Sequence, residues 1–142
     1  MNIWPPYLAA GIRVREIQPD YRYARVQLRL GWTNRNYVNV HFGGSLFAMT
    51  DPFFMLMYMK NLGRDYIVWD KAASIDFVRP GRGTVQAEFH LSPADLEQAR
   101  AEAGRQRSAL IKRLVEIHDT EGALVARVER VVYIRKKSAE TS

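Results

Sequence analysis

The chain has 142 residues, of which 47% are hydrophobic and 11% aromatic, and it contains no cysteine. This size and apolar content predict one folded domain over residues 1–142, with a core over about 12–134, and exclude a disordered chain. The lack of cysteine excludes disulfides, thiolate metal sites and a cysteine nucleophile. The formal net charge of +6 suits a polyanionic ligand, although a solvated basic surface explains it more simply.

The N-terminus and the longest apolar run decide the expected location of the protein. Residues 1–6 carry neither the basic nor the apolar region of a secretory signal. Residues 43–59 approach the length of a membrane-spanning helix, but Asp51 and Pro52 interrupt them. We therefore expect a cytoplasmic protein that does not cross a membrane.

In chain order, alternating apolar and polar residues predict strands separated by turns. A short N-terminal helix or arm leads into strands over 12–17 and 24–30. A polar loop then precedes the apolar run, which predicts a buried helix that ends near Gly63. Further strands are expected over residues 66–78, 85–91, 110–118 and 124–134.

A second, shorter helix is expected between the strands over 85–91 and 110–118. Residues 92–95 read Ser-Pro-Ala-Asp, with a serine cap, a proline at the first helical position and an acid three residues after the cap. We expect this helix to end at Gly104. Strands joined by short turns, with an apolar helix among them, favour an α+β architecture: an antiparallel sheet of five or six strands around one long central helix.

Asp51 is the candidate catalytic residue. It lies in a segment that is apolar on all sides, and such segments are normally buried. A buried carboxylate is costly unless it is hydrogen-bonded or protonated, and a chain that keeps one often uses it. One alternative remains open, in which Asp51 caps a helix whose first residue is Pro52.

The residues before Asp51 resemble the sequence signature of a known family. Two glycines, Gly43 and Gly44, stand ahead of the acid, with seven residues from the second glycine to Asp51. This string resembles the signature of the phenylacetate-type acyl-CoA thioesterases, and Asn36 matches an asparagine in the loop ahead of their helix. The histidine that usually abuts the two glycines is replaced here by Phe42.

Residues 70–81, which include an Arg-Pro-Gly turn, resemble the next strand and turn of the same family. The similarity extends over about residues 12–134. It implies the hotdog fold, in which an antiparallel sheet wraps a central helix that begins here at the glycine pair. It also implies hydrolysis of an acyl-CoA thioester, without a cofactor, in a homodimer or a dimer of dimers.

The resemblance assigns roles to individual residues. Asp51 would activate water as a general base or attack the thioester directly. Unpaired backbone N–H groups at Gly43 and Gly44 would stabilise the negative oxygen that forms during attack. Basic side chains on either side of the strand turn could meet the phosphates of CoA. The candidate substrate contacts are Asn36, His41, Lys71, Arg79 and Arg82.

The spacing of the glycines and the acid favours a site between subunits. Seven residues of helix separate Gly44 from Asp51 by roughly 10 Å along the axis. One carbonyl group can hardly contact both residues within one chain. Two facing chains could bring Gly44 of one copy near Asp51 of the other.

Other functions remain open. A non-catalytic acyl-ligand-binding or regulatory module would fit the loss of the family histidine, and a hotdog dehydratase or hydratase would pair His41 with Asp51. Nucleic acid is not an expected partner, because the arginines form no known reader motif. No metal is expected, because the three histidines lack the spacing of metal ligands.

Overall fold

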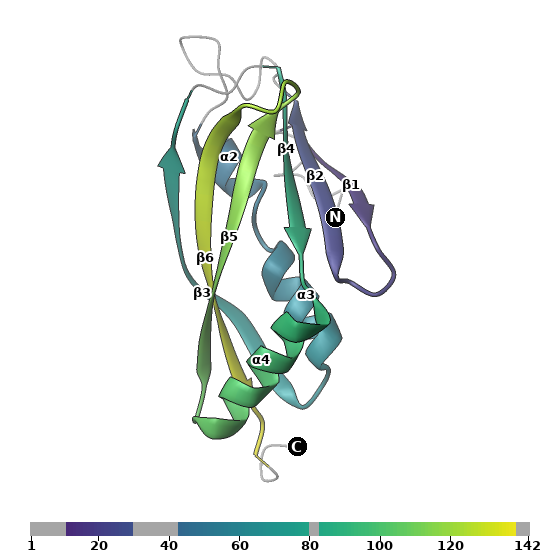
Figure 1. Ribbon diagram of the computed structural model, residues 1–142, viewed down its shortest axis with the longest axis vertical. Coiled ribbons are helices and arrows are strands. Elements are labelled where there is room, and N and C mark those ends of the chain that lie inside the picture. The colour runs from purple at the N-terminus through teal and green to yellow at the C-terminus, as the bar shows by residue number, and fades with distance from the viewer. Residues whose placement is uncertain (1–10, 30–42, 80–82, 139–142) are drawn as a thin grey trace.

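The computed structural model describes residues 11–29, 43–79 and 83–138. Six antiparallel strands form one sheet in the order β1-β2-β4-β5-β6-β3, which confirms the α+β class (Figure 1). The strands are β1 (Ile12–Ile17), β2 (Tyr23–Arg29), β3 (Tyr66–Phe77), β4 (Thr84–His90), β5 (Ala109–Asp119) and β6 (Leu124–Lys136). The helices of the described residues are α2 (Gly43–Ala48), α3 (Phe53–Leu62) and α4 (Pro93–Arg105).

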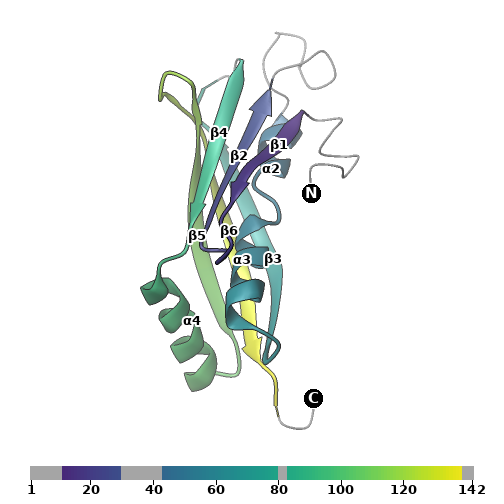
Figure 2. The ribbon, with the colours of Figure 1, turned by 90° about the vertical axis from the view of Figure 1, so that its right-hand side faces the viewer.

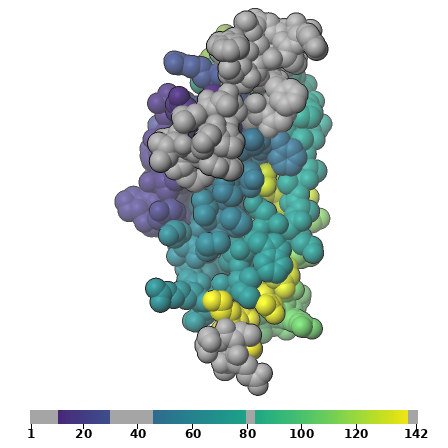
Figure 3. All heavy atoms as spheres, turned by 180° about the vertical axis from the view of Figure 1, so that it is seen from behind, coloured from purple at the N-terminus to yellow at the C-terminus, as the bar shows by residue number. Residues whose placement is uncertain are grey.

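The sheet bends around α2 and α3, and α4 lies beside α3 at one end of the molecule (Figure 2). Seen from behind, α2 and α3 remain visible between β1 and β3, the two edge strands of the sheet (Figure 3). The helices therefore have one face packed on the sheet and another that no strand of the described residues covers.

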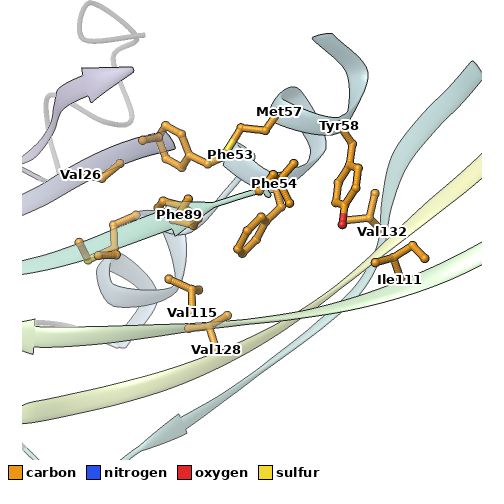
Figure 4. Packing of buried hydrophobic residues seen from close by; sticks show 14 of the residues in the cluster. Val26, Phe53, Phe54, Met57, Tyr58, Phe89, Ile111, Val115, Val128 and Val132 are labelled. Carbon is orange, nitrogen blue, oxygen red and sulfur yellow. The ribbon is translucent and has the colours of Figure 1, made fainter. Parts of the chain in front are cut away.

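The core forms where α3 meets the sheet. Phe53 and Phe54 point from α3 toward Phe89 of β4, with ring centroids 5.0 and 5.1 Å from the Phe89 centroid (Figure 4). Met49 and Met57 are at most 2% exposed. These residues are packed core, as the all-apolar pattern of the segment predicts.

The central helix begins at Gly43, as the resemblance implies, but a turn over residues 49–52 divides it. Pro52 has no backbone N–H to donate to the carbonyl of Ala48, and it disfavours helical backbone at the preceding residue. The N–H of Asp51 donates to the Ala48 carbonyl instead, at 3.1 Å. This bond joins residues three apart, whereas an α-helix joins residues four apart. The second segment, α3, starts directly after the proline.

The shorter helix, α4, begins as predicted. The Ser92 hydroxyl accepts from the Asp95 N–H at 3.1 Å, and the Asp95 carboxylate accepts from the Ser92 N–H at 2.8 Å. The expectation that Gly104 ends this helix is wrong, because α4 continues to Arg105. A glycine in the last turn costs only about 1 kcal/mol relative to alanine, so the helix can pass through it.

Ser92→Ala tests the start of α4. The change removes the acceptor for the Asp95 N–H, and we expect the free energy of unfolding to fall by about 1 kcal/mol. Urea unfolding measures the difference. Glu97→Ala, which loses only an exposed ion pair with Arg100 on the same helix, is the control and should cost about 0.2–0.5 kcal/mol. Equal stability of Ser92→Ala and wild type would contradict the capping role.

Candidate active site

Asp51 lies on the turn between α2 and α3. Its side chain is 51% exposed, so the prediction of a buried carboxylate is wrong for this chain. The reason is the helix break, which places the acid on a turn instead of inside an apolar helix. Asp51 does not cap α3 either, because Pro52 occupies the cap position and no side chain makes a capping hydrogen bond.

The buried charge of this region is Arg130 of β6, which the sequence analysis did not single out. Arg130 is 5% exposed. Its Nη2 donates to Asp51 Oδ1 at 3.1 Å and to Asp70 Oδ2 at 3.5 Å. Its Nη1 donates to the Thr50 hydroxyl at 3.2 Å. One guanidinium therefore binds three side chains from two segments, the helix turn and β3, that are both distant from Arg130 in the sequence.

The alternation of the last strand carried a signal for Arg130. From Ala126 to Ile134, every second residue is apolar except at position 130. An arginine on an otherwise apolar face needs partners, because an unpaired buried charge is very costly. The pattern does not say which of the acids in the chain supplies them.

Asp70 reaches Arg130 from β3. The register of β3 against β6 shifts between Asp70 and Ala72, so a β-bulge at Lys71 follows the acid. Bulges of this kind re-aim side chains and are common beside active sites. The Asp70 side chain is 20% exposed. Its Oδ1 is buried and has no hydrogen-bond partner among the residues that the structure describes.

The surroundings of Asp70 favour its protonated form. Burial raises the pKa of Asp70 to about 6, and the hydrogen bond and negative charge of Asp51 add to the rise. The positive charge of Arg130 opposes the rise in pKa without cancelling it. Asp70 can therefore change its protonation near neutral pH.

Thr50 links Arg130 to α2. Its side chain is fully buried, and its hydroxyl donates to the Phe47 carbonyl at 2.8 Å while accepting from Arg130. The Phe47 ring centroid lies 5.4 Å from the guanidinium carbon of Arg130, within the range of a cation–π contact. The end of α2 thus holds the guanidinium in place. We call Thr50, Asp51, Asp70 and Arg130 the Arg130 cluster.

A second inward arginine adjoins the cluster but has other partners. Arg113 of β5 lies opposite Arg130 in the register. Its two Nη atoms donate to the Asp95 carboxylate and to the His90 carbonyl, both at 3.2 Å. Arg113 therefore belongs to the contact between α4 and the sheet.

The glycine pair stands at the other end of α2 from the acid. Gly43 and Gly44 start this helix, whose six residues span about 9 Å. Asp51 follows its C-terminal end. Within one chain, the candidate oxyanion donors and the candidate base are thus separated, as the spacing in the sequence predicts.

The candidate phosphate contacts do not converge. Lys71 is exposed in the bulge of β3, and Arg79 is exposed beyond the end of that strand. The extended chain between them spans about 26 Å, so the two side chains of one protomer cannot hold one phosphate together. Three further candidates lie outside the described residues: Asn36, His41 and Arg82.

An open groove of about 850 Å³ lies away from the Arg130 cluster, between β2, β4 and β5. Its walls include Gln27, Gln86 and Glu116, and none of the candidate residues lines it. The groove therefore has no part in the chemistry of Asp51.

Within residues 11–29, 43–79 and 83–138, no three His, Asp or Glu side chains gather in a way that could hold a metal ion. Nor does any helix there combine the length and the apolar character needed to cross a membrane.

Solved structures identify the architecture as the hotdog fold. A Pseudomonas aeruginosa protein of unknown function, described as a probable thioesterase, is similar at a TM-score of 0.82 and 20% identity, over 94% of this chain and 88% of that one. A thioesterase from Haemophilus influenzae gives 0.66 at 13% identity, over 95% and 85%. The PaaI protein from the phenylacetic acid degradation operon of E. coli gives 0.61 at 17% identity, over 96% and 87%. These similarities confirm the predicted fold.

A match to a sequence family describes the chain more narrowly than the hotdog fold does. The family described as Domain of unknown function (DUF4442) matches residues 1–134, and the chain belongs to it. No curated protein matches the chain.

Asp70→Asn tests the charge balance of the Arg130 cluster. The pKa of Asp70 in the folded protein, about 6, exceeds its ordinary value of 3.8, so the folded chain binds the proton more tightly than the unfolded chain does. The stability gained in this way is complete below the ordinary pKa and is lost as the pH rises through the folded pKa. Relative to Asp70→Asn, wild type should lose on the order of 2 kcal/mol of unfolding free energy between about pH 4 and pH 7.

Urea unfolding of both proteins across this pH range checks the expectation. Asp76→Asn, at an exposed position of the same strand, is the control and should retain the pH dependence of wild type. If the stabilities of wild type and Asp70→Asn run parallel with pH, Asp70 does not hold its proton as described.

Proposed function

We propose that the protein hydrolyses an acyl thioester, with acyl-CoA as the substrate class, at a site built around Asp51. The observation that carries the proposal is a half-exposed carboxylate held by a buried arginine: Asp51 Oδ1 accepts from Arg130 at 3.1 Å. A carboxylate fixed in this way needs little reorganisation to act on a bound substrate. The fold shared with proteins described as thioesterases supports the choice of reaction.

In the proposed reaction, Asp51 takes a proton from water while the water oxygen attacks the thioester carbon. The carbonyl oxygen becomes negative, and backbone N–H groups at Gly43 and Gly44 donate to it. Collapse of the tetrahedral intermediate breaks the C–S bond, and the leaving thiolate receives the proton. The products are a carboxylic acid and a thiol. Direct attack by Asp51 would instead form an anhydride, which water then hydrolyses.

In this proposal a second copy of the chain completes the site. Among the described strands, β3 has 12 residues and pairs only with β6, so it is an edge of the sheet. Long edge strands are ready templates for pairing with another chain. Two apolar side chains of β3, Trp69 and Phe77, are 43% and 55% exposed. Pairing of β3 with its copy would bring the glycine pair of one chain toward Asp51 of the other, and two such dimers could associate further.

The remaining expectations from the sequence stay predictions. Lys71, Arg79 and Arg82 are the proposed contacts of the CoA phosphates. Because Lys71 and Arg79 lie far apart in one chain, in this proposal they contact different phosphates or belong to the two sites of a dimer. Asn36 and His41 are the proposed contacts in the loop before α2. We also keep the expectation of a single domain over residues 1–142, located in the cytoplasm and working without a cofactor.

Asp51→Asn tests the proposed base. Asparagine has nearly the same size but is neither a base nor an anionic nucleophile. We expect kcat/KM to fall by about 100-fold or more, measured as free thiol released from a panel of acyl-CoA substrates. Glu97→Gln, at a position 74% exposed on α4, is the control and should keep wild-type activity.

Three other results would change the assignment. An unchanged kcat/KM in folded Asp51→Asn would remove Asp51 from the mechanism. Tight acyl-CoA binding without thiol release in the wild type would identify a binding or regulatory module. Activity on enoyl thioesters, with none on saturated ones, would identify a hydratase.

Mixing two inactive variants tests the shared site. Gly44→Val blocks the donor end of α2, and Asp51→Asn removes the acid. If each site takes these residues from different chains, a heterodimer of the two variants has one intact site. A mixed refolding that yields half heterodimers should therefore recover about a quarter of wild-type activity. Sedimentation equilibrium verifies the dimers, and heterodimers without activity, or a wild type that is monomeric at micromolar concentration, would refute the shared site.

A further inference from the structure

Two carboxylates meet at one donor nitrogen of Arg130. Nη2 lies 3.1 Å from Asp51 Oδ1 and 3.5 Å from Asp70 Oδ2, while Nη1 is bound to Thr50. The arginine side chain is only 6% exposed. It cannot move into solvent with one acid and keep its hydrogen bond to the other. The two carboxyl groups are thereby held next to each other on a common donor.

Asp70 has one acceptor atom that the pairing with Arg130 does not use. Its Oδ1 is buried and lacks a donor among the described residues. A buried acceptor without a donor is costly, and in native structures it calls for an explanation. A proton held between the two carboxyl groups, on Asp70 or on Asp51, would satisfy it.

The charges around Asp70 come from few elements. Asp51 on the helix turn and Arg130 on β6 are the groups that act on it. The helix α2 carries no charged residue, and Lys60 is exposed on α3. On β5, Arg113 lies opposite Arg130 but is bound to an acid of α4. The protonation of Asp70 therefore follows the state of Asp51 and Arg130.

We propose that Asp51 and Asp70 work as a carboxylate pair that shares one proton during hydrolysis, and that Arg130 is the residue that positions the pair. The inference rests on the proposed thioester hydrolysis. At pH values above the pKa of Asp70, about 6, both acids are ionised around the guanidinium before the reaction. Asp51 takes the proton from the attacking water, and the Asp70 carboxylate accepts a hydrogen bond from the protonated Asp51. The proton then passes to the leaving thiolate, which returns both acids to their ionised state.

Two features favour a proton that is shared between the two acids. The negative charge of Asp70 favours a neutral neighbour over a charged one, because like charges at short range repel. The hydrogen bond to Asp70 also stabilises the protonated form that develops during attack. At acidic pH the pair already holds its proton, so it cannot accept another from water and the activity is lost.

The pH dependence of kcat/KM for acyl-CoA tests the pair. Wild type should lose activity on the acidic side with a midpoint near the pKa of Asp70, about 6. Asp70→Asn is neutral at every pH, so its midpoint should fall by at least about one pH unit and its plateau by about 10-fold. Asp76→Asn on the same strand should keep the wild-type midpoint.

Arg130→Lys tests positioning. Lysine keeps the positive charge but cannot bind Thr50 and both acids with the geometry of a guanidinium. We expect kcat to fall by about 100-fold with little change in KM. Arg127→Lys on the same strand, where the native side chain is bound to exposed Glu116 at 3.1 Å, is the matched control and should stay active. If Arg130→Lys is folded and fully active, Arg130 does not position the pair.

A carboxyl ¹³C NMR titration of the aspartates gives a readout that needs no substrate. The Asp70 midpoint should fall in Asp51→Asn, because the like charge and the hydrogen-bond partner are lost. An unchanged midpoint would overturn the pair whether or not the protein hydrolyses thioesters.

The failures of the two proposals are distinguishable. An active wild type whose acidic limb is the same in Asp70→Asn would overturn the shared proton and leave the thioesterase function standing. A wild type without activity, but with coupled titration of Asp51 and Asp70, would overturn the function together with the role of the pair in hydrolysis.

Discussion

The buried guanidinium of Arg130 is the interaction on which the candidate site depends. A charge withdrawn from water costs several kcal/mol unless polar and oppositely charged groups replace the water. Two separate segments supply these groups to the arginine of β6: the helix turn gives Thr50 and Asp51, and β3 gives Asp70. Because β3 and β6 are paired neighbours in the sheet, the arginine fixes both acids relative to that sheet and ties the helix turn to it.

The proline in the central helix is the second constraint. An uninterrupted helix would carry Asp51 along with the apolar residues around it, where a carboxylate is costly. Pro52 ends the first helical segment, and the acid leaves the core on the resulting turn. The same residue that breaks the helix therefore makes the carboxylate accessible, while Thr50, one residue before the acid, stays fully buried and anchors the turn. Because the buried Thr50 holds the turn, the half-exposed carboxylate of Asp51 is accessible to a ligand while its movement is restricted.

In the proposed mechanism, the site is incomplete within one chain. The glycine pair starts α2 and the acid lies beyond its C-terminal end, and a single carbonyl group cannot span a helix of that length. The long edge strand β3, which also carries Asp70, offers a surface on which a second copy could supply the missing end. Membership of a family described by a domain of unknown function leaves the chemistry to be argued from these residues. The proposed hydrolysis rests on a carboxylate that a buried arginine holds in place, with a second acid on the same arginine.

The sequence by itself determined the strands and the turn between β5 and β6, because each depends on neighbouring residues: alternation for a strand and turn residues for a hairpin. The start of the central helix at Gly43 followed from the resemblance to the thioesterase signature, because the local pattern alone also allowed a start at Pro52. The sequence also singled out Asp51 as the acid to consider. The exposure of Asp51 was decided by the tertiary structure, because it depends on how the chain turns at Pro52 and packs afterwards. The partners of Arg130 were decided there as well. Asp51 and Asp70 lie 79 and 60 positions away from it along the chain. No local pattern links residues so distant, and a buried charge finds its partners only when the register of the sheet and the packing of the helix turn bring them together.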